Sequence, residues 1–237
     1  MTEEPYRWLE AIANRREYIR EQLRGGTPVF AVSRPEGILL LGVGLGRSKV
    51  FEIYDRHACA ALGHPVDIEK LRQSAIEAAH LEGFQRSPAD VTLRRLISFA
   101  LSPALKASFE QIFSPPSIVE SVWAELGESP ASDLLVRVRY DGHHHYEVGG
   151  LVVAHVDPKR EEEAAAWLRG QVQPTQSLRH VAGLCLLAWQ ALQEGTPLAD
   201  LAVPPVPPVT LPGRNVEAAL LDRARPGAVR YRELTLG

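Results

Sequence analysis

The sequence predicts a layered α+β domain in which pairs of helices pack on β-sheets. Runs of short apolar segments, typical of strands, alternate along the chain with pairs of amphipathic segments, an order that a repeating βαβ fold does not produce. Hydrophobic residues make up 45% of the 237 residues and charged residues 23%, which is typical of globular proteins and excludes wholesale disorder. No internal repeat or clear boundary divides the chain, so residues 1–237 are expected to form a single domain.

The first part of the chain predicts one helix followed by four strands. Apolar residues fall largely on one side of an amphipathic helix over Pro5–Leu23, and the pair Gly25-Gly26 ends that helix. A turn at Arg34–Gly37, where proline and glycine supply the turn geometry, separates the first two apolar runs. The four strands are expected at residues 28–33, 37–43, 49–54 and 58–62.

The middle of the chain predicts two long helices. The first is expected over Ile68–Leu81, with Asp67 as its N-cap. The second is expected over Val91–Phe113, with Asp90 as its N-cap. Pro103 lies inside this second segment and is expected to bend or split the helix.

The last part of the chain predicts strands, two further helices and two closing strands. The strands are expected at residues 118–126, 134–140 and 147–156. The helices are expected at residues 161–168 and 178–193. Segment 203–213 contains five prolines and is expected to be a stiff connector, which leads to the closing strands at residues 216–221 and 229–236.

Charge and cysteine content restrict the partners and the compartment. The net charge is −3, which argues against nucleic acid as the main partner because nucleic-acid binders carry a basic excess or patch. Cys59 and Cys185 are too few for a disulfide framework and are expected to be buried thiols in a reducing compartment. The N-terminus does not resemble a signal peptide, and no apolar run reaches the roughly 20 residues that span a bilayer. We therefore expect a cytoplasmic protein.

Two segments have the composition of a ligand site but not its spacing. Gly42–Lys49 contains three glycines, yet it fits neither the P-loop nor the dinucleotide pattern, so a glycine-rich turn is the preferred interpretation. His143–His145 lies at the tip of an expected hairpin, where adjacent side chains alternate in direction and do not converge on one metal. We expect no metal and no cofactor. The residues alone predict an α+β domain of unassigned function.

Several short segments occur in the order found in one protein family, the α-type subunits of bacterial proteasome core particles. They are Glu17–Gly26, Lys49–Arg56, Ala60–Gly63, Glu82–Phe84, Asp90–Thr92, Val122–Gly127, Arg139–Gly142 and Val216–Asp222. The chain resembles this family over nearly its whole length. The resemblance implies a four-layer αββα sandwich, the fold of N-terminal-nucleophile hydrolases, with an extra N-terminal helix within residues 1–24.

The resemblance implies a subunit without catalytic residues. The catalytic β-type subunits use an N-terminal threonine, a lysine and an aspartate. When that pattern is threaded on this chain, Gly26 takes the position of the nucleophile, with Thr27 one place later. The aspartate position falls at Gly42-Val43, which has no carboxylate, and only the lysine has a counterpart, Lys49. Two alternatives stay open, namely a self-compartmentalised threonine peptidase processed before Thr27 and a diverged pseudo-enzyme that forms no ring.

The resemblance also implies the partners. It predicts a heptameric ring that stacks on rings of β-type subunits, controls substrate entry, and binds the C-terminal tails of an ATPase ring or an ATP-independent activator. Lys49, Glu17 and Gly63 match positions that line the tail pocket between neighbouring subunits, although a solvated lysine at a strand start would look the same in the sequence. The expected gate residues are Met1, Thr2, Glu3, Glu4, Pro5 and Tyr6. The helix face with Trp8, Ile12 and Ile19 is the candidate subunit contact, with core packing as the alternative.

Overall fold

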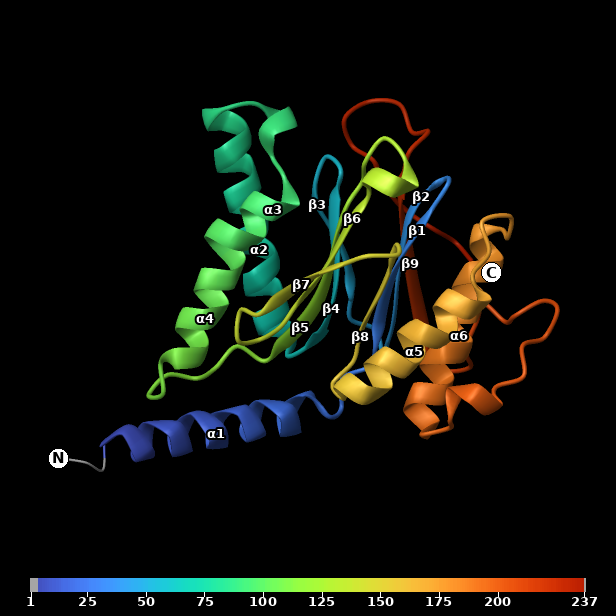
Figure 1. Ribbon diagram of the computed structural model, residues 1–237. Helices are drawn as coiled ribbons and strands as arrows, with labels where there is room; N and C mark the ends of the chain where they lie inside the picture. The colour runs from blue at the N-terminus through green and yellow to red at the C-terminus, as the bar shows by residue number, and fades with distance from the viewer. Residues whose placement is uncertain (1–3, 237) are drawn as a thin grey trace.

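The computed structural model of the chain describes residues 4–236 and shows an α+β fold with two antiparallel five-stranded sheets that face each other (Figure 1). In strand order, the first sheet consists of β10 (Tyr231–Glu233), β9 (Asn215–Asp222), β2 (Gly37–Gly44), β1 (Val29–Arg34) and β8 (Leu151–Ala154). The second sheet consists of β3 (Val50–Tyr54), β4 (His57–Gly63), β5 (Val119–Glu125), β6 (Leu134–Val138) and β7 (His144–Glu147).

Two helical layers cover the outer faces of these sheets (Figure 1). The second sheet is covered by α2 (Pro65–Gln85), α3 (Leu93–Arg95), a π-helical turn at Leu96–Leu101, and α4 (Ser102–Glu110). The first sheet is covered by α5 (Pro158–Gln171) and α6 (Leu178–Glu194). Short 3-10 turns lie at Pro88–Asp90, Pro130–Ser132 and Leu198–Asp200. Within residues 4–236, no helix combines the length and the apolar character needed to cross a membrane.

Both faces of the central strands are apolar, and alternate residues enter different cores. In β1, Ala31 faces the core between the two sheets, whereas Phe30 packs against α5 and α6. In β4, Ala60 faces the same inter-sheet core, whereas Cys59 packs toward α2. Because successive side chains of a strand point to opposite faces, each sheet must be covered on both sides, and the predicted pairs of helices provide this cover.

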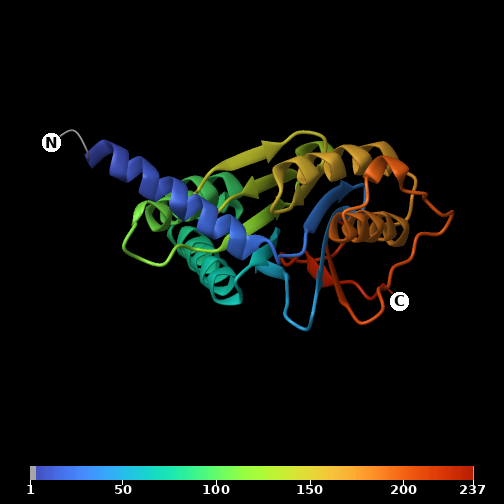
Figure 2. The same cartoon turned by 90° about the horizontal axis from the view of Figure 1, so that it is seen from below.

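The first helix, α1 (Glu4–Leu23), crosses the lower end of the sandwich and extends beyond α4 (Figure 2). Its last turns are anchored because Ile19 and Leu23 are fully buried in the inter-sheet core. Arg15 adds a polar anchor, since its guanidinium donates to the carbonyl oxygens of Ser108 and Ser114, each at 2.8 Å. The helix face predicted to contact another subunit therefore lies partly in the core and partly in solvent.

Ile19 packs in the core, which was the alternative to a subunit contact, and Ile12 packs partly against the same core. Trp8 is 50% exposed and remains available for contact with another molecule.

The expectation of one strand at residues 147–156 is wrong. The segment contains the end of β7 and all of β8, which belong to different sheets. Gly149 and Gly150 separate them with φ angles of +110° and +70°, a backbone region that favours glycine and interrupts an extended strand. The chain crosses from the second sheet to the first at this point.

The helix expected over Val91–Phe113 runs from Leu93 to Glu110 as three consecutive pieces, α3, a π-helical turn and α4, and Pro103 lies in the first turn of α4. Proline lacks an N–H and clashes with the carbonyl of the preceding turn, and the wider π-helical turn immediately before Pro103 accommodates both effects. The N-cap prediction is also wrong, because Thr92 rather than Asp90 caps the helix, with its Oγ1 accepting from the Arg95 N–H at 3.4 Å.

Asp67 is not an N-cap either. Helix α2 begins at Pro65, two residues before Asp67, and the missing N–H of this proline suits the first helical turn. The Asp67 carboxylate instead accepts the backbone N–H of Ile118 at 3.0 Å, which ties the start of α2 to the entry of β5. The remaining helices and strands lie within a few residues of their predicted positions.

Segment 203–213 forms neither a helix nor a strand, and it packs closely against α6. A Cβ atom at Gly183 would lie 2.6 Å from the side chain of Pro207, so only glycine fits in this part of α6. The proline-rich segment is therefore part of the packed surface of the domain.

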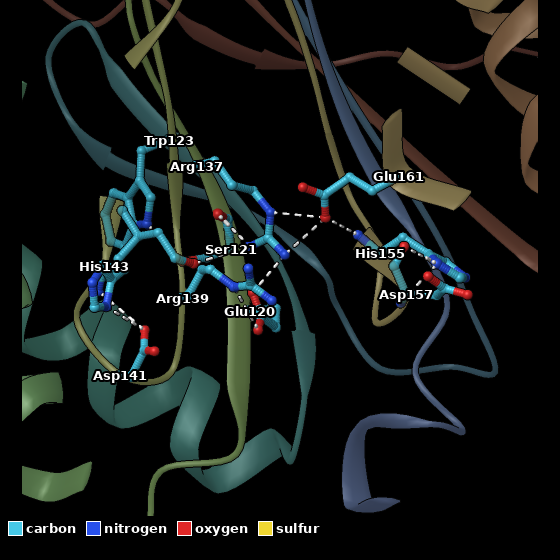
Figure 3. A network of polar contacts seen from close by, with 11 residues as sticks. Glu120, Ser121, Trp123, Arg137, Arg139, Asp141, His143, His155, Asp157 and Glu161 are labelled. Carbon is cyan, nitrogen blue, oxygen red and sulfur yellow. Dashed lines mark hydrogen bonds and ion pairs between the residues drawn. The ribbon is translucent and has the colours of Figure 1, made fainter. Parts of the chain in front are cut away.

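A buried ionic network joins the second sheet to α5 (Figure 3). Arg137 on β6 is 4% exposed and contacts Glu120 on β5 at 2.5 Å and Glu161 on α5 at 3.0 Å. The same Glu161 oxygen accepts the backbone N–H of His155 at 2.9 Å, just after β8. Arg139 is 34% exposed and lies 3.7 Å from Glu120, so the two carboxylates are balanced by two guanidinium groups.

We expect Arg137→Met to destabilise the fold by about 3–5 kcal/mol, because it leaves Glu120 buried without its main partner. Arg139→Met is the matched control, and because this side chain is partly solvated the expected cost is below about 1 kcal/mol. Urea unfolding of both variants measures the difference. Similar losses in the two variants would contradict the central role of Arg137.

Candidate functional site

A cavity of about 480 Å³ opens at the end of the sandwich where β2 and β4 finish and α2 begins. Its walls include Gly44 at the end of β2, Lys49 just before β3, and Gly63 at the end of β4. Phe51 and Ile68 supply an apolar side. The cavity therefore combines one cationic side chain, two glycines and an apolar wall.

The Lys49 ammonium is held in place by Thr27. Its Nζ donates to Thr27 Oγ1 at 2.5 Å and to the Thr27 carbonyl oxygen at 3.1 Å. The Thr27 hydroxyl in turn donates to the carbonyl oxygen of Val43 at 2.5 Å, so its oxygen is free to accept from the lysine. Two neutral oxygens from one residue thus fix the position of the charge.

No carboxylate within residues 4–236 forms an ion pair with the Lys49 side chain. The nearest acidic influence is Glu217 on β9, but its Oε2 accepts the backbone N–H of Lys49 at 2.7 Å and that of Val50 at 3.3 Å. Burial lowers the pKa of Lys49 to about 8, and the charge of Glu217 opposes this shift. At neutral pH the side chain is therefore still a cation, without an anionic partner of its own.

Gly42 on β2 makes room for the stem of this lysine, since a Cβ atom there would lie 3.0 Å from Lys49 Cβ. A Cβ atom at Gly44 would lie 3.0 Å from the carbonyl oxygen of Arg47, and its distance of 3.8 Å from Lys49 Cε is an ordinary contact. The glycine-rich segment is thus a strand end followed by a turn, with Gly46 at φ +96° in the turn. Gly42 lets the lysine stem lie close to the sheet.

Gly63 has a different constraint at the opposite wall. Its φ angle is +132°, and a Cβ atom there would lie 2.2 Å from the carbonyl oxygen of Ile118. Only glycine fits, because any side chain here would collide with the backbone of Ile118. At the rim, Glu69 is paired with Arg72 through two contacts of 2.8 and 2.9 Å, and this pairing lowers the pKa of Glu69.

The structure brings together some of the predicted site residues. Lys49 and Gly63 line the same cavity, whereas Glu17 lies exposed on α1 and is not part of its lining. Of the predicted gate, residues 1–3 lie outside the described residues, and the backbone of residues 4–6 forms the start of α1.

Thr27 is the residue that the sequence interpretation misplaced, because Thr27 rather than Gly26 lies against Lys49. Gly26 packs against Leu62 instead. In the antiparallel pairing of β1 and β2, Val29 lies opposite Gly42. When this register is extended to the residues before Val29, Thr27 lies beside the end of β2. At the segment Gly42-Val43, where the catalytic pattern has its aspartate, the carbonyl oxygen of Val43 accepts the hydroxyl of Thr27.

The other candidate residues do not form a reactive site. Cys59 and Cys185 are free and buried, and burial raises the pKa of both thiols, to about 12 for Cys185. His143 is exposed beyond the end of β6, and His144 contacts Ser102 at 2.8 Å. Among residues 4–236, no group of histidine, cysteine and acidic side chains has the arrangement of a metal site.

Comparison with known proteins identifies relatives along nearly the whole chain. The chain is 34% identical over 218 residues to "Proteasome subunit alpha" of Renibacterium salmoninarum, which covers 90% of this chain and 82% of that protein. It is 33% identical over 229 residues to the protein of the same name from Jonesia denitrificans, with coverages of 96% and 91%. For the Streptomyces scabiei protein of that name, identity is 30% over 227 residues, with coverages of 95% and 85%. No family model matches the chain.

The lowered pKa of Lys49 predicts a pH dependence of stability. Between pH 8 and about 10.4 the unfolded chain retains a proton on this lysine that the folded chain has released, so the unfolding free energy rises with pH. We expect the wild-type protein to gain about 2 kcal/mol relative to Lys49→Met between pH 7 and pH 10. Urea unfolding at both pH values measures this difference. Identical pH dependence in the two proteins would contradict the buried-cation interpretation.

Proposed function

The chain belongs to the proteasome α-subunit family, the non-catalytic subunits of a threonine protease complex, and we propose that it forms a heptameric ring that docks the tails of an activator. In this proposal the ring stacks on rings of β-type subunits, which carry the threonine nucleophiles. The two facing sheets and their helical layers are assigned to the four-layer αββα sandwich of N-terminal-nucleophile hydrolases. The compartment proposed is the cytoplasm.

One observation carries the docking proposal: the Lys49 ammonium lines a cavity and has no carboxylate partner among the described residues. A desolvated cation without an anion is unfavourable, and a free C-terminal carboxylate that enters the cavity supplies the missing charge. The apolar side formed by Phe51 and Ile68 suits an apolar residue next to that carboxylate. Gly63 lines the same cavity without contributing a side chain to it.

Glu17 is proposed as a further residue of the tail-binding site. It is exposed on α1 and does not line the cavity of its own subunit. The gate is proposed at Met1–Tyr6. These residues precede or begin α1, whose last turns are anchored in the core through Ile19 and Leu23. A rigid anchor at one end of a helix positions the residues at its other end.

Peptidase activity of this chain would require a free amine on Thr27, and the structure offers a physical argument against it. Thr27 follows Gly26 in the chain, so its nitrogen is part of a peptide bond. Cleavage before Thr27 would remove α1, and with it the buried side chains of Ile19 and Leu23 from the inter-sheet core. The chain is therefore a non-catalytic subunit whose Thr27 positions a lysine.

Assembly is tested by the native mass of the chain, alone and co-expressed with its β-type partner. We expect a ring of about 183 kDa, seven times the 26.1 kDa of the chain, or a larger stacked particle with the partner. Analytical ultracentrifugation or native mass spectrometry measures this mass. A monomer under both conditions would sink the ring proposal and favour the pseudo-enzyme that forms no ring.

Docking is tested with the assembled particle and a labelled peptide that has an apolar residue beside a free C-terminal carboxylate. We expect Lys49→Met to weaken binding about tenfold to a hundredfold, since a hydrogen bond between charged groups contributes roughly 1.5–3 kcal/mol. Binding by the wild type should also fall above pH 8, because free Lys49 loses its proton there while a bound carboxylate holds it.

The exposed residue Lys70 on α2 offers the matched control for the docking experiment. Lys70→Met removes the same charge from a side chain that does not line the cavity, and its binding should equal that of the wild type. A C-terminally amidated peptide should bind as weakly to the wild type as the free acid binds to Lys49→Met. Equal binding of the acid and the amide would contradict carboxylate recognition.

A further inference from the structure

Lys49 differs from the other lysines of the chain in its surroundings. The chain has four lysines, and Lys70, Lys106 and Lys159 are exposed to solvent. Lys49 is partly buried, and its Nζ is fixed on one side by the two oxygens of Thr27. The same side chain lines the cavity of about 480 Å³, so a small molecule that enters the cavity meets an immobilised amine.

We propose that Lys49 is an acylation site, at which a small acyl phosphate transfers its acyl group to Nζ inside the cavity and thereby switches off the docking of carboxylate tails. The acylation itself is a property of the cavity and its amine. The switching half of the proposal rests on the proposed docking function.

The neutral amine is the nucleophile in this reaction, and the surroundings of Lys49 favour it. Thr27, just before β1, contacts the Lys49 side chain, and the charge of Glu217 on β9 acts on it. Arg47 in the β2–β3 turn and Glu69 on α2 line the same cavity. Glu69 is neutralised by its pairing with Arg72, and Glu217 is occupied by two backbone N–H groups. With its pKa at about 8, roughly a tenth of Lys49 is unprotonated at pH 7.

The transfer step is balanced without any further reagent. The Nζ lone pair attacks the carbonyl carbon of the acyl phosphate, a C–N bond forms, and the C–O bond to phosphorus breaks. The phosphate leaves with the electron pair of that bond, and the proton lost by the amine passes to the phosphate or to solvent. The products are an amide on Lys49 and inorganic phosphate.

The lining of the cavity suits an anionic donor with a small acyl group. Arg47 is exposed at the rim, where its guanidinium can attract the phosphate of the donor. The cavity of about 480 Å³ that Lys49 lines offers the space for the acyl group. After transfer, the amide carries no charge and fills part of the space that a tail carboxylate would occupy.

The acylation is tested on the folded chain with acetyl phosphate at pH 7, with the acetylation rate of each lysine followed by mass spectrometry of peptides. We expect Lys49 to react at least tenfold faster than Lys70, Lys106 and Lys159, which serve as internal references. In the urea-unfolded chain the four rates should become similar, because the selectivity depends on the fold. A rate at Lys49 equal to or below the references in the folded chain would overturn the proposal, as would the same selectivity in the unfolded chain.

The switching half is tested by binding of the labelled carboxylate peptide before and after treatment with acetyl phosphate. We expect treatment to weaken binding to the wild type at least tenfold. Lys49→Arg retains a cation but has no amine that is acetylated, so its binding should be unaffected by the treatment.

The outcomes separate this inference from the docking proposal. Fast acetylation of Lys49 without any loss of peptide binding would overturn the switch and also count against docking at this cavity. Slow acetylation, combined with binding that is lost in Lys49→Met, would overturn the acylation proposal and leave docking supported.

Discussion

One packing constraint shapes most of this molecule: both faces of the central strands are largely apolar and must be covered. Alternate residues of these strands pack in the inter-sheet core and against the helical layers. Apart from the buried network around Arg137, apolar packing therefore occupies the faces of the central strands. What remains is the edges of the layers and the ends of the strands, and the Lys49 cavity lies at such an end, where β2, β3, β4 and α2 meet.

The same constraint explains why α1 is part of the packed domain. Its last turns insert Ile19 and Leu23 into the core between the sheets, so the helix completes the packing of the domain. Only three residues separate Leu23 from Thr27, and Thr27 holds the ammonium of Lys49. Retention of the helix keeps the Thr27 nitrogen in a peptide bond, and the threonine contributes its oxygens to positioning in place of catalysis.

The sequence predicted the order of helices and strands because apolar periodicity is a local property. It did not separate β7 from β8, since the strand-like composition is continuous and only the φ angles of Gly149 and Gly150 interrupt it. It assigned Asp67 to a cap, whereas a long-range contact with Ile118 engages that carboxylate. Lys49 and Gly63 were found through short motifs, but the pairing of Lys49 with Thr27 depends on strand register, which the threading set one residue off. The Arg137 network joins segments that are distant in the sequence, so no local sequence pattern predicts it.

The close approach of Gly42 to the stem of Lys49 affects how related sequences are compared. A lysine at this position means little by itself, since the same residue can extend into solvent. A Cβ atom at position 42 would lie 3.0 Å from Lys49 Cβ, so a larger residue there requires the lysine stem to shift. The β2 residue that faces the stem is therefore as informative about this site as the lysine itself.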